Sequence, residues 1–180
     1  VENDIYEIGL IELNKNNVGK VSIKNLKTPK LNIDELLFTK DGKNVYVEVT
    51  GKKIDLSNLS KNLKSKNQKT KSINLDLTAD LIRLNSKISL TGNLKGKIKD
   101  NSFNSIAYGK LLLGGKSLID NGEFKLNVNN KISRLEGLGS VGGAETKINL
   151  QKKINSFPSL LFETSDGGKL LSALGFTKNI

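Results

Sequence analysis

The side chains in this sequence that could act together in a reaction are two aspartates, Asp76 and Asp80, in the segment NLDLTADL. Two carboxylates can perform general acid–base chemistry when they share a proton or flank one reacting bond. The alternation of polar and apolar residues around them predicts a strand. On one strand face the two aspartates lie beyond the spacing of a shared-proton pair, so we interpret both as solvated surface charges.

Other features that could support chemistry are missing or weak. The chain contains no Cys, His or Trp, which excludes thiolate and imidazole metal sites and any mechanism that needs a Cys or His from this chain. The pairs Gly114-Gly115 and Gly142-Gly143 lack the Lys-Ser/Thr or strand-to-helix context of phosphate-binding loops. We therefore predict no catalytic residue, no metal site, no cofactor and no enzymatic activity.

The charge of the chain suggests binding to an acidic partner as an alternative function. The net charge is +11, and residues 60–72 contain lysines but no acid. Such a run could contact an anionic glycan or a nucleic acid. Only Arg83 and Arg134 are arginines among 29 basic residues, and aromatic residues are few, which argues against phosphate and base recognition. We expect no nucleic acid partner and interpret residues 60–72 as a solvated basic loop.

The length and hydropathy of the chain set its broad class. A chain of 180 residues can form one domain with a sizeable core. It has no apolar run of eighteen residues and no recognisable signal peptide, so no membrane span is predicted within it. The chain begins at Val1 and contains no Met, which indicates a fragment or a processed product. We expect any membrane anchor to lie outside these residues.

Period-two alternation dominates most of the chain and predicts strands with one buried face and one solvated face. The clearest segments are 73–81, with an apolar residue at every odd position, and 87–99, whose apolar face also contains Gly92 and Gly96. Glycines at these places could let the sheet bend or leave room for a ligand. Further strands are predicted over 5–13, 18–26, 31–38, 45–49, 103–113, 124–128, 132–141, 147–150 and 160–164.

Short turns join these strands, with hairpin signals at Asp41-Gly42 and Asn121-Gly122. Because no crossover helix fits between them, we expect an antiparallel meander. We divide this single β-rich module into leading strands (1–59), a basic loop (60–72), a main antiparallel sheet (73–164) and a short helix (165–175).

The tail is the one part without strand alternation. Asp166 can cap a helix start, and Leu170, Leu171 and Leu174 follow at helical spacing on one face. Gly175 then suits a left-handed C-terminal cap. A helix this short is unstable alone and must pack on the sheet.

The same tail carries a resemblance to a known family. The segment SDGGKLLSALGFTKNI resembles the sequence that ends a module of the AsmA-like envelope proteins of Gram-negative bacteria, the YhdP and TamB type. The strands within 73–150 are similar more loosely, and Gly167 departs from the family pattern. The matching tail positions are Ser165, Asp166, Gly168, Leu170, Leu171, Ala173, Leu174, Gly175, Asn179 and Ile180.

The resemblance implies an elongated, curved, taco-like β-sheet groove that moves phospholipid between the inner and outer membranes. The chain would be a periplasmic segment of an inner-membrane-anchored protein, held to the membrane by parts not present here. Leu170, Leu171 and Leu174 would cap or plug the groove, facing inward. Acyl chains would contact the apolar row, which comprises Leu75, Leu77, Ile88, Leu90, Leu94, Ile98, Leu126 and Val128.

The pattern alone leaves two uses of this apolar face open. It can pack against protein in a closed β-sandwich, which would suit a binding module for an acidic partner. Alternatively, it can line the open groove that the resemblance implies. Under the groove hypothesis, Leu94→Asp should abolish lipid occupancy while the sheet survives, whereas loss of folding would support the closed core.

Overall fold

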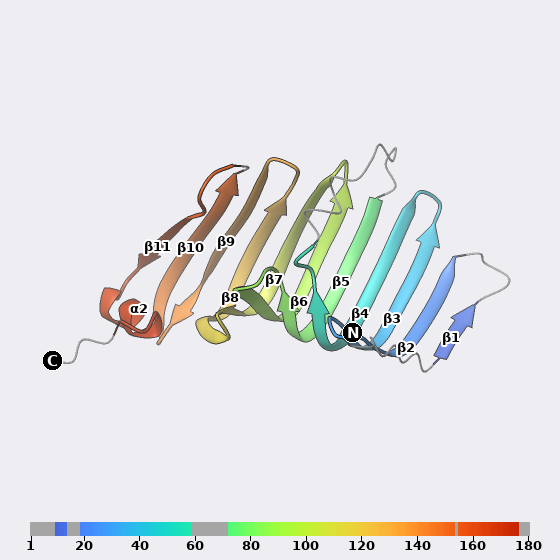
Figure 1. The fold of residues 1–180 in the computed structure, drawn as a ribbon, viewed down its shortest axis with the longest axis horizontal. Helices are drawn as coiled ribbons and strands as arrows, with labels where there is room; N and C mark the ends of the chain where they lie inside the picture. The colour runs from blue at the N-terminus through green and yellow to red at the C-terminus, as the bar shows by residue number, and fades with distance from the viewer. Residues whose placement is uncertain (1–9, 14–18, 59–71, 154, 177–180) are drawn as a thin grey trace, which may run out of the picture.

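The computed structural model describes residues 10–13, 19–58, 72–153 and 155–176, and all of its strands belong to one open, curved sheet (Figure 1). The strands lie side by side in chain order, from β1 at one edge to β11 at the other. This confirms the predicted β-meander with one short C-terminal helix. The strands are β1 (Leu10–Leu13), β2 (Lys20–Lys27), β3 (Asn32–Asp41), β4 (Asn44–Asp55), β5 (Ser72–Arg83), β6 (Ile88–Lys99), β7 (Ser102–Leu113), β8 (Lys116–Val128), β9 (Ile132–Val141), β10 (Ala144–Lys153) and β11 (Ser159–Thr164).

One pair of neighbouring strands departs from the predicted antiparallel order. β4 and β5 pair in parallel, with Val45 beside Ile73 and Val49 beside Leu77. A parallel neighbour requires the chain to return across the sheet. Residues 56–71 connect the two strands, and this segment, which contains nearly all of the predicted basic loop 60–72, is long enough for that return. The expectation of antiparallel pairing throughout the sheet was therefore wrong at this point.

The alternation of burial along the strands follows the alternation in the sequence. In β8, Phe124 and Leu126 are buried while Glu123, Lys125 and Asn127 are exposed. Strand pairing places Phe124 of β8 beside Ala107 of β7, Ala107 beside Leu94 of β6, and Leu94 beside Leu77 of β5. We call this apolar side of the sheet the inner face and the opposite side the outer face.

A row of small residues crosses the inner face of the central strands, and we call it the crease. It consists of Gly51 on β4, Ala79 on β5, Gly92 on β6, Gly109 on β7 and Gly122 on β8, each paired with the next. Strand pairing shifts register beside the crease in four pairs of strands: β3 and β4, β5 and β6, β7 and β8, and β8 and β9. Bulges and glycines permit sharp local bends, and the sheet folds along this row.

The bulges explain two errors of the sequence-based prediction. The register shift after Ala79 puts Ile82, rather than Leu81, on the inner face, and Ile82 is fully buried. Asn121-Gly122 lies within β8 and makes no hairpin turn. Asn121 has a φ of +50°, a left-handed backbone that suits a bulge as well as a turn.

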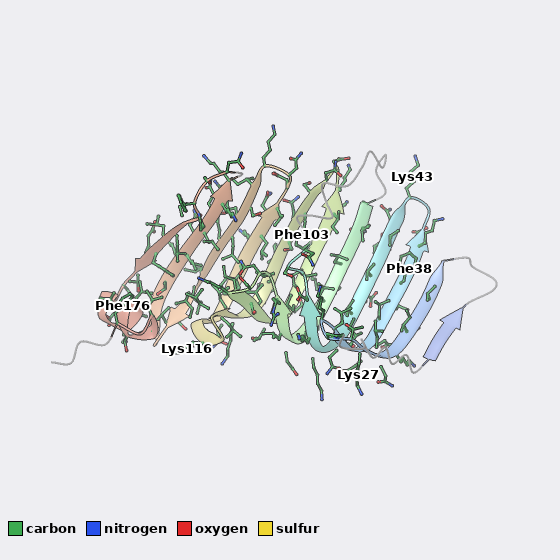
Figure 2. All side chains as sticks on the ribbon, viewed as in Figure 1. Lys27, Phe38, Lys43, Phe103, Lys116 and Phe176 are labelled. Atoms are coloured by element: carbon green, nitrogen blue, oxygen red, sulfur yellow. The ribbon has the colours of Figure 1, made fainter. Side chains whose placement is uncertain are left out.

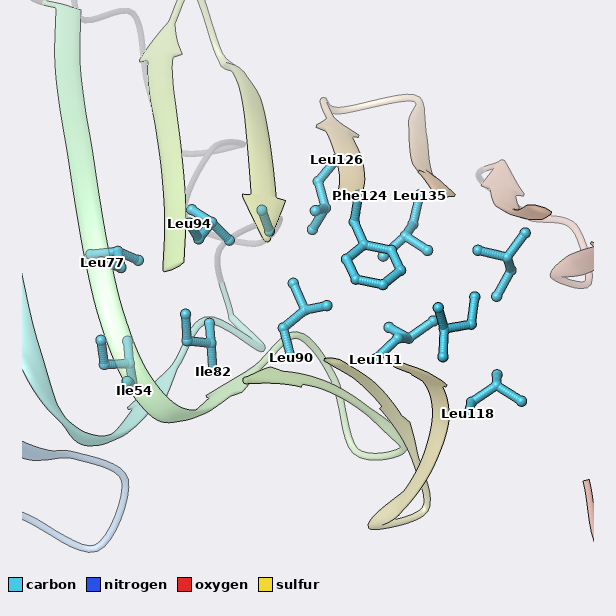
Figure 3. Close-up of a cluster of buried hydrophobic side chains, with 14 of the residues drawn as sticks. Ile54, Leu77, Ile82, Leu90, Leu94, Leu111, Leu118, Phe124, Leu126 and Leu135 are labelled. Atoms are coloured by element: carbon cyan, nitrogen blue, oxygen red, sulfur yellow. The ribbon is translucent and has the colours of Figure 1, made fainter. Parts of the chain in front are cut away.

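Folding along the crease makes two walls out of one sheet. The lower wall contains the parts of β4 to β8 beyond the crease, residues 52–55, 80–83, 88–91, 110–113 and 116–121, and the upper wall contains the rest of these strands. Figure 3 shows Ile54, Ile82, Leu90, Leu111 and Leu118 facing Leu77, Leu94, Phe124, Leu126 and Leu135. These side chains form one buried cluster, so the sheet covers part of its own apolar face.

The helix α2 (Gly167–Ala173) lies at the C-terminal end of the sheet (Figure 1). As predicted, Asp166 caps it: the Lys169 backbone N–H donates to Asp166 Oδ1 at 3.1 Å. The Asp166 N–H in turn donates to the Thr164 hydroxyl at 3.2 Å, which joins the cap to the end of β11. Gly175 follows with a φ of +87°, the left-handed C-terminal cap that the sequence indicated.

Candidate functional site

The structure divides the eight predicted lipid-contacting residues into two groups. Leu77, Leu90, Leu94 and Leu126 are buried in the cluster between the two walls, and Leu94 has no exposed surface. Leu75, Ile88, Ile98 and Val128 are half-buried and pack against the outside of that cluster. Leu94→Asp is therefore expected to unfold the sheet, because an unpaired buried charge is very costly. This holds whether the inner face packs against protein or lines an open groove.

The half-buried group belongs to a larger set that follows both walls. On the upper wall Leu75, Ile98 and Val128 are joined by Val47 and, on β10, by Leu150. On the lower side Ile88 is joined by Leu56, Leu84 and Leu113. We call these two rows the apolar lips, because they border the buried cluster and remain partly accessible to solvent.

The sequence-based prediction missed part of the lips. Leu56 and Leu84 directly follow β4 and β5, where the inner face has passed from odd-numbered to even-numbered positions, as the buried Ile54 and Ile82 show. Leu113 lies at the end of β7, which keeps its odd-numbered inner face throughout. In the sequence, the only sign of the bulges was the glycines at Gly92, Gly109 and Gly122. They can be interpreted only when it is known which residues pair across the strands. Val47 and Leu150 lay on predicted strands but outside the segments with the clearest alternation.

The predicted plug residues of the tail do not all face the sheet. Leu170 is buried in the core cluster, and Leu174 packs against it. Leu171, in contrast, is 51% exposed, so the expectation that it faces inward was wrong. A helix of seven residues has room for one buried stripe, and positions 170 and 174 occupy it while position 171 points away.

The outer face carries charges of both signs in close pairs. Lys95 Nζ lies 2.8 Å from the Asp76 carboxylate, and Arg134 lies 3.6 Å from Glu136. Lys147 lies 3.9 Å from Glu163. Because an acid stands beside each of these three bases, these pairs give no support to the acidic-partner hypothesis. The lysines of 61–71 lie outside the described residues.

Asp76 illustrates how these surface pairs act on ionisation. Partial burial opposes the charged form, but hydrogen bonds from Lys95 and Asn93 outweigh it and lower the pKa of Asp76. The same contact raises the pKa of Lys95. Asn93 donates to Asp76 Oδ1 at 2.9 Å and lies 3.1 Å from the Thr78 hydroxyl. This carboxylate helps to hold β5 and β6 together, so Asp76 is a paired, partly buried charge and not the freely solvated one that was predicted. Asp80 is exposed, as predicted.

Two shallow hollows lie on the outer face of the C-terminal half. One, of about 400 Å³, is bordered by Lys125, Glu136 and Leu161. The other, of about 790 Å³, is bordered by Lys95, Asn104 and Arg134. Their linings mix charged residues with apolar ones, such as Leu138 in the first and Ile106 in the second. Neither contains the convergent, desolvated polar groups expected of a reaction centre.

Within the described ranges no three acidic side chains converge as a metal site would require. The helix found there is too short and too polar to cross a bilayer. Comparisons with protein-family models, with curated proteins and with solved structures found no match to this chain.

Proposed function

We propose that this chain is a non-enzymatic section of an AsmA-like bridge protein, and that its inner face carries phospholipid acyl chains between the inner and outer membranes. The tail motif and the looser similarity of the strands support the family. The fold supports a role in carrying acyl chains, because a long sheet folded along a crease leaves an apolar strip along its length. On this proposal the chain lies in the periplasm, and the membrane is reached through other parts of the whole protein.

The observation that carries the proposal is the pair of apolar lips. Single half-buried apolar residues are common at the edge of a core, whereas contiguous apolar surface more often marks a binding site. Ile98, Val128 and Ile88 stay half-buried beside the core, on both sides of one strip. Each methylene group that an acyl chain buries there contributes about 0.8 kcal/mol, so a chain lying along several strands would be held without any specific polar contact.

The test compares two isoleucines on the paired strands β6 and β7 whose side chains lie on opposite faces of the sheet. Ile98 belongs to the upper lip on β6, whereas Ile106 on β7 is 39% exposed on the outer face. Native mass spectrometry and lipid extraction of the purified chain should show bound phospholipid in the wild type and in Ile106→Asp, but not in Ile98→Asp. Circular dichroism should show the same strand content in all three.

Two results would overturn the proposal. One is a wild-type chain that carries no phospholipid after purification and takes up none from vesicles. The other is equal lipid binding by Ile98→Asp and Ile106→Asp, which would mean that the lip does not contact the acyl chain.

A further inference from the structure

We propose that Lys87 and Lys116 bind the phosphate of a phospholipid whose acyl chain lies against the lower lip, so that the chain prefers phospholipids with a net negative headgroup. We call these two residues the lip lysines. The preference rests on the proposed function, because it concerns the same bound lipid. Both lysines are exposed, and both stand beside half-buried apolar side chains of the lower lip.

Strand pairing places Lys116 on the inner face beside the lower lip. Leu113 of β7 pairs with Ile88 of β6 on one side and with Lys116 of β8 on the other. Directly opposite residues of neighbouring strands lie on the same sheet face, so Lys116 continues the row that Ile88 and Leu113 form. The two residues between Leu113 and Lys116 are glycines with φ angles of +60° and +84°, as a tight two-residue hairpin turn requires. Figure 2 shows Lys116 at the end of the lower wall.

Hydrogen bonds hold Lys87 next to that hairpin turn. Asn85 Oδ1 accepts from the backbone N–H groups of Lys87 and Ile88, each at 2.8 Å. The carbonyl oxygen of Lys87 in turn accepts from the Gly114 N–H at 2.8 Å. The turn between β5 and β6 and the turn between β7 and β8 therefore lie side by side, and each carries one exposed lysine.

The lip lysines have no acid beside them, unlike most bases on the outer face. Five bases there lie between 2.8 and 3.9 Å from a carboxylate oxygen, namely Lys95, Lys110, Lys125, Arg134 and Lys147. Among the described residues, no acid forms an ion pair with Lys87 or Lys116. Asp120, the acid closest to Lys116 in the sequence, accepts from the Ser117 hydroxyl at 2.7 Å and lies 3.6 Å from Lys110. Two unpaired ammonium groups on neighbouring turns leave a local positive charge that an anion can neutralise.

The upper lip has a turn of the same kind. The sequence NSKI at the lower lip recurs as NNKI at 129–132. In both turns the Asn side chain accepts from the backbone N–H of the Lys and from that of the residue after it, at 2.8 to 2.9 Å. Val128 of the upper lip directly precedes the second turn, whose Lys131 is exposed. An exposed lysine in the same kind of turn therefore borders the apolar strip on both sides.

A lipid with a net negative headgroup fits these groups better than a wholly polar anion does. Leu113 is the direct neighbour of Lys116, and a soluble phosphate or a nucleic acid would leave the leucine uncovered. A phosphatidylglycerol headgroup carries a net negative charge, whereas a phosphatidylethanolamine headgroup adds an ammonium group that the lip lysines repel. Because lysine acts on phosphate as a point charge, the site should select for charge and not for one headgroup structure.

Uptake of lipid from mixed vesicles tests the preference. The whole chain is incubated with vesicles that contain equal amounts of phosphatidylglycerol and phosphatidylethanolamine with identical acyl chains. It is then re-isolated, and its bound lipid is extracted and quantified by mass spectrometry. The wild type should carry phosphatidylglycerol in about three- to ten-fold excess, and added NaCl should reduce that excess. The double variant Lys87→Gln/Lys116→Gln should carry the two lipids in nearly equal amounts.

The matched control removes the same charge from the outer face of β6 and β8. Lys97 and Lys125 are exposed there, so Lys97→Gln/Lys125→Gln should retain the wild-type excess of phosphatidylglycerol. An equal loss in both double variants would assign the preference to the net charge of the whole chain and would overturn the proposal. An unchanged excess in Lys87→Gln/Lys116→Gln would overturn it as well.

Two further outcomes separate the headgroup site from the proposed function. A wild type that takes up both lipids equally would overturn the headgroup site and leave the proposed function standing, whereas a wild type that takes up neither would overturn both. Glycerol phosphate in millimolar excess should not change the ratio of the bound lipids. If it abolished the excess of phosphatidylglycerol, the lip lysines would bind soluble phosphate and not the headgroup of a lipid held at the lip.

Discussion

Gly92 and Gly109 face each other across β6 and β7, and neither position has room for a Cβ atom. A Cβ on Gly109 would overlap the carbonyl oxygen of Thr91, and one on Gly92 would overlap that of Tyr108. Their φ angles are +105° and +147°, which side chains disfavour. The close approach of the two backbones lets the sheet fold along the crease, and the crease creates both the buried cluster and the lips.

The first prediction concerns the crease. Gly109→Ala should destabilise the fold by about 2–4 kcal/mol, because it combines backbone strain with a steric overlap that no side-chain rotation can relieve. Gly114→Ala is the matched control: Gly114 also has a positive φ, of +60°, but its Cβ would meet no atom within 4 Å. Gly114→Ala should lower the free energy of unfolding by about 1 kcal/mol. Urea unfolding measures both, and equal losses would contradict the role assigned to the crease.

The second prediction concerns the core between the two walls. Leu94→Ala removes a side chain with no exposed surface and should lower the free energy of unfolding by about 2–5 kcal/mol. Leu138→Ala, with the leucine 46% exposed on the outer face, should cost less than about 1 kcal/mol. Thermal unfolding of the two variants provides the comparison. A similar small loss in both would mean that the lower wall does not cover Leu94 in solution.

The third prediction follows from the lowered pKa of Asp76. A carboxyl group whose pKa is lower in the folded state stabilises the fold above its unfolded value of 3.8, and this contribution disappears as the pH falls through the folded pKa. Asp76→Asn should therefore lose stability at pH 7 and show a smaller further loss between pH 5 and pH 2. Because the Asp76 side chain is 38% exposed, the effect should stay below about 1 kcal/mol.

The matched control for Asp76 is Asp80→Asn on the same strand. Asp80 is exposed, and the structure gives it none of the contacts with Lys95 and Asn93 that Asp76 makes. Denaturant titrations at several pH values should separate the two variants. If Asp80→Asn changed the acid dependence as much as Asp76→Asn does, the β5–β6 pair would not be its source.

The fourth prediction concerns the cap of α2. Asp166→Ala removes the acceptor for the Lys169 N–H and should cost about 0.5–2 kcal/mol of helix stability. Because Leu170 anchors the helix in the core cluster and α2 contacts β9, loss of the cap should also raise amide hydrogen exchange in α2 and at the end of β9. Asp166→Asn retains a capping oxygen and should restore most of the protection. No change in exchange for Asp166→Ala would contradict the capping role.

The sequence predicted those features that depend on local pattern. Alternation along 73–79 and 88–99 identified the strands and their buried faces, and Asp166 and Gly175 marked the ends of α2. These signals are local because a strand face or a helix cap is determined by residues within a few positions.

The features that the sequence did not reveal depend on register between strands. The parallel β4–β5 pair, the bulge that replaces Leu81 with Ile82, and the position of Asn121-Gly122 within β8 each require knowledge of which residues lie side by side. The sequence indicated a possible bend at Gly92, but only strand pairing shows that Gly51, Gly109 and Gly122 join it in one crease. Because the sheet folds at the crease, the predicted row of lipid-contacting residues divides into buried core residues and half-buried residues of the lips.

The central claim is that an acyl chain lies on the inner face, and neighbouring positions on one strand test it most directly. Val128 belongs to the upper lip, and Asn127 beside it points from the outer face. A photoreactive side chain at each position, activated with phospholipid vesicles present, should form a lipid adduct from position 128 and little from position 127. Adducts of equal yield from both positions, or from neither, would contradict the account.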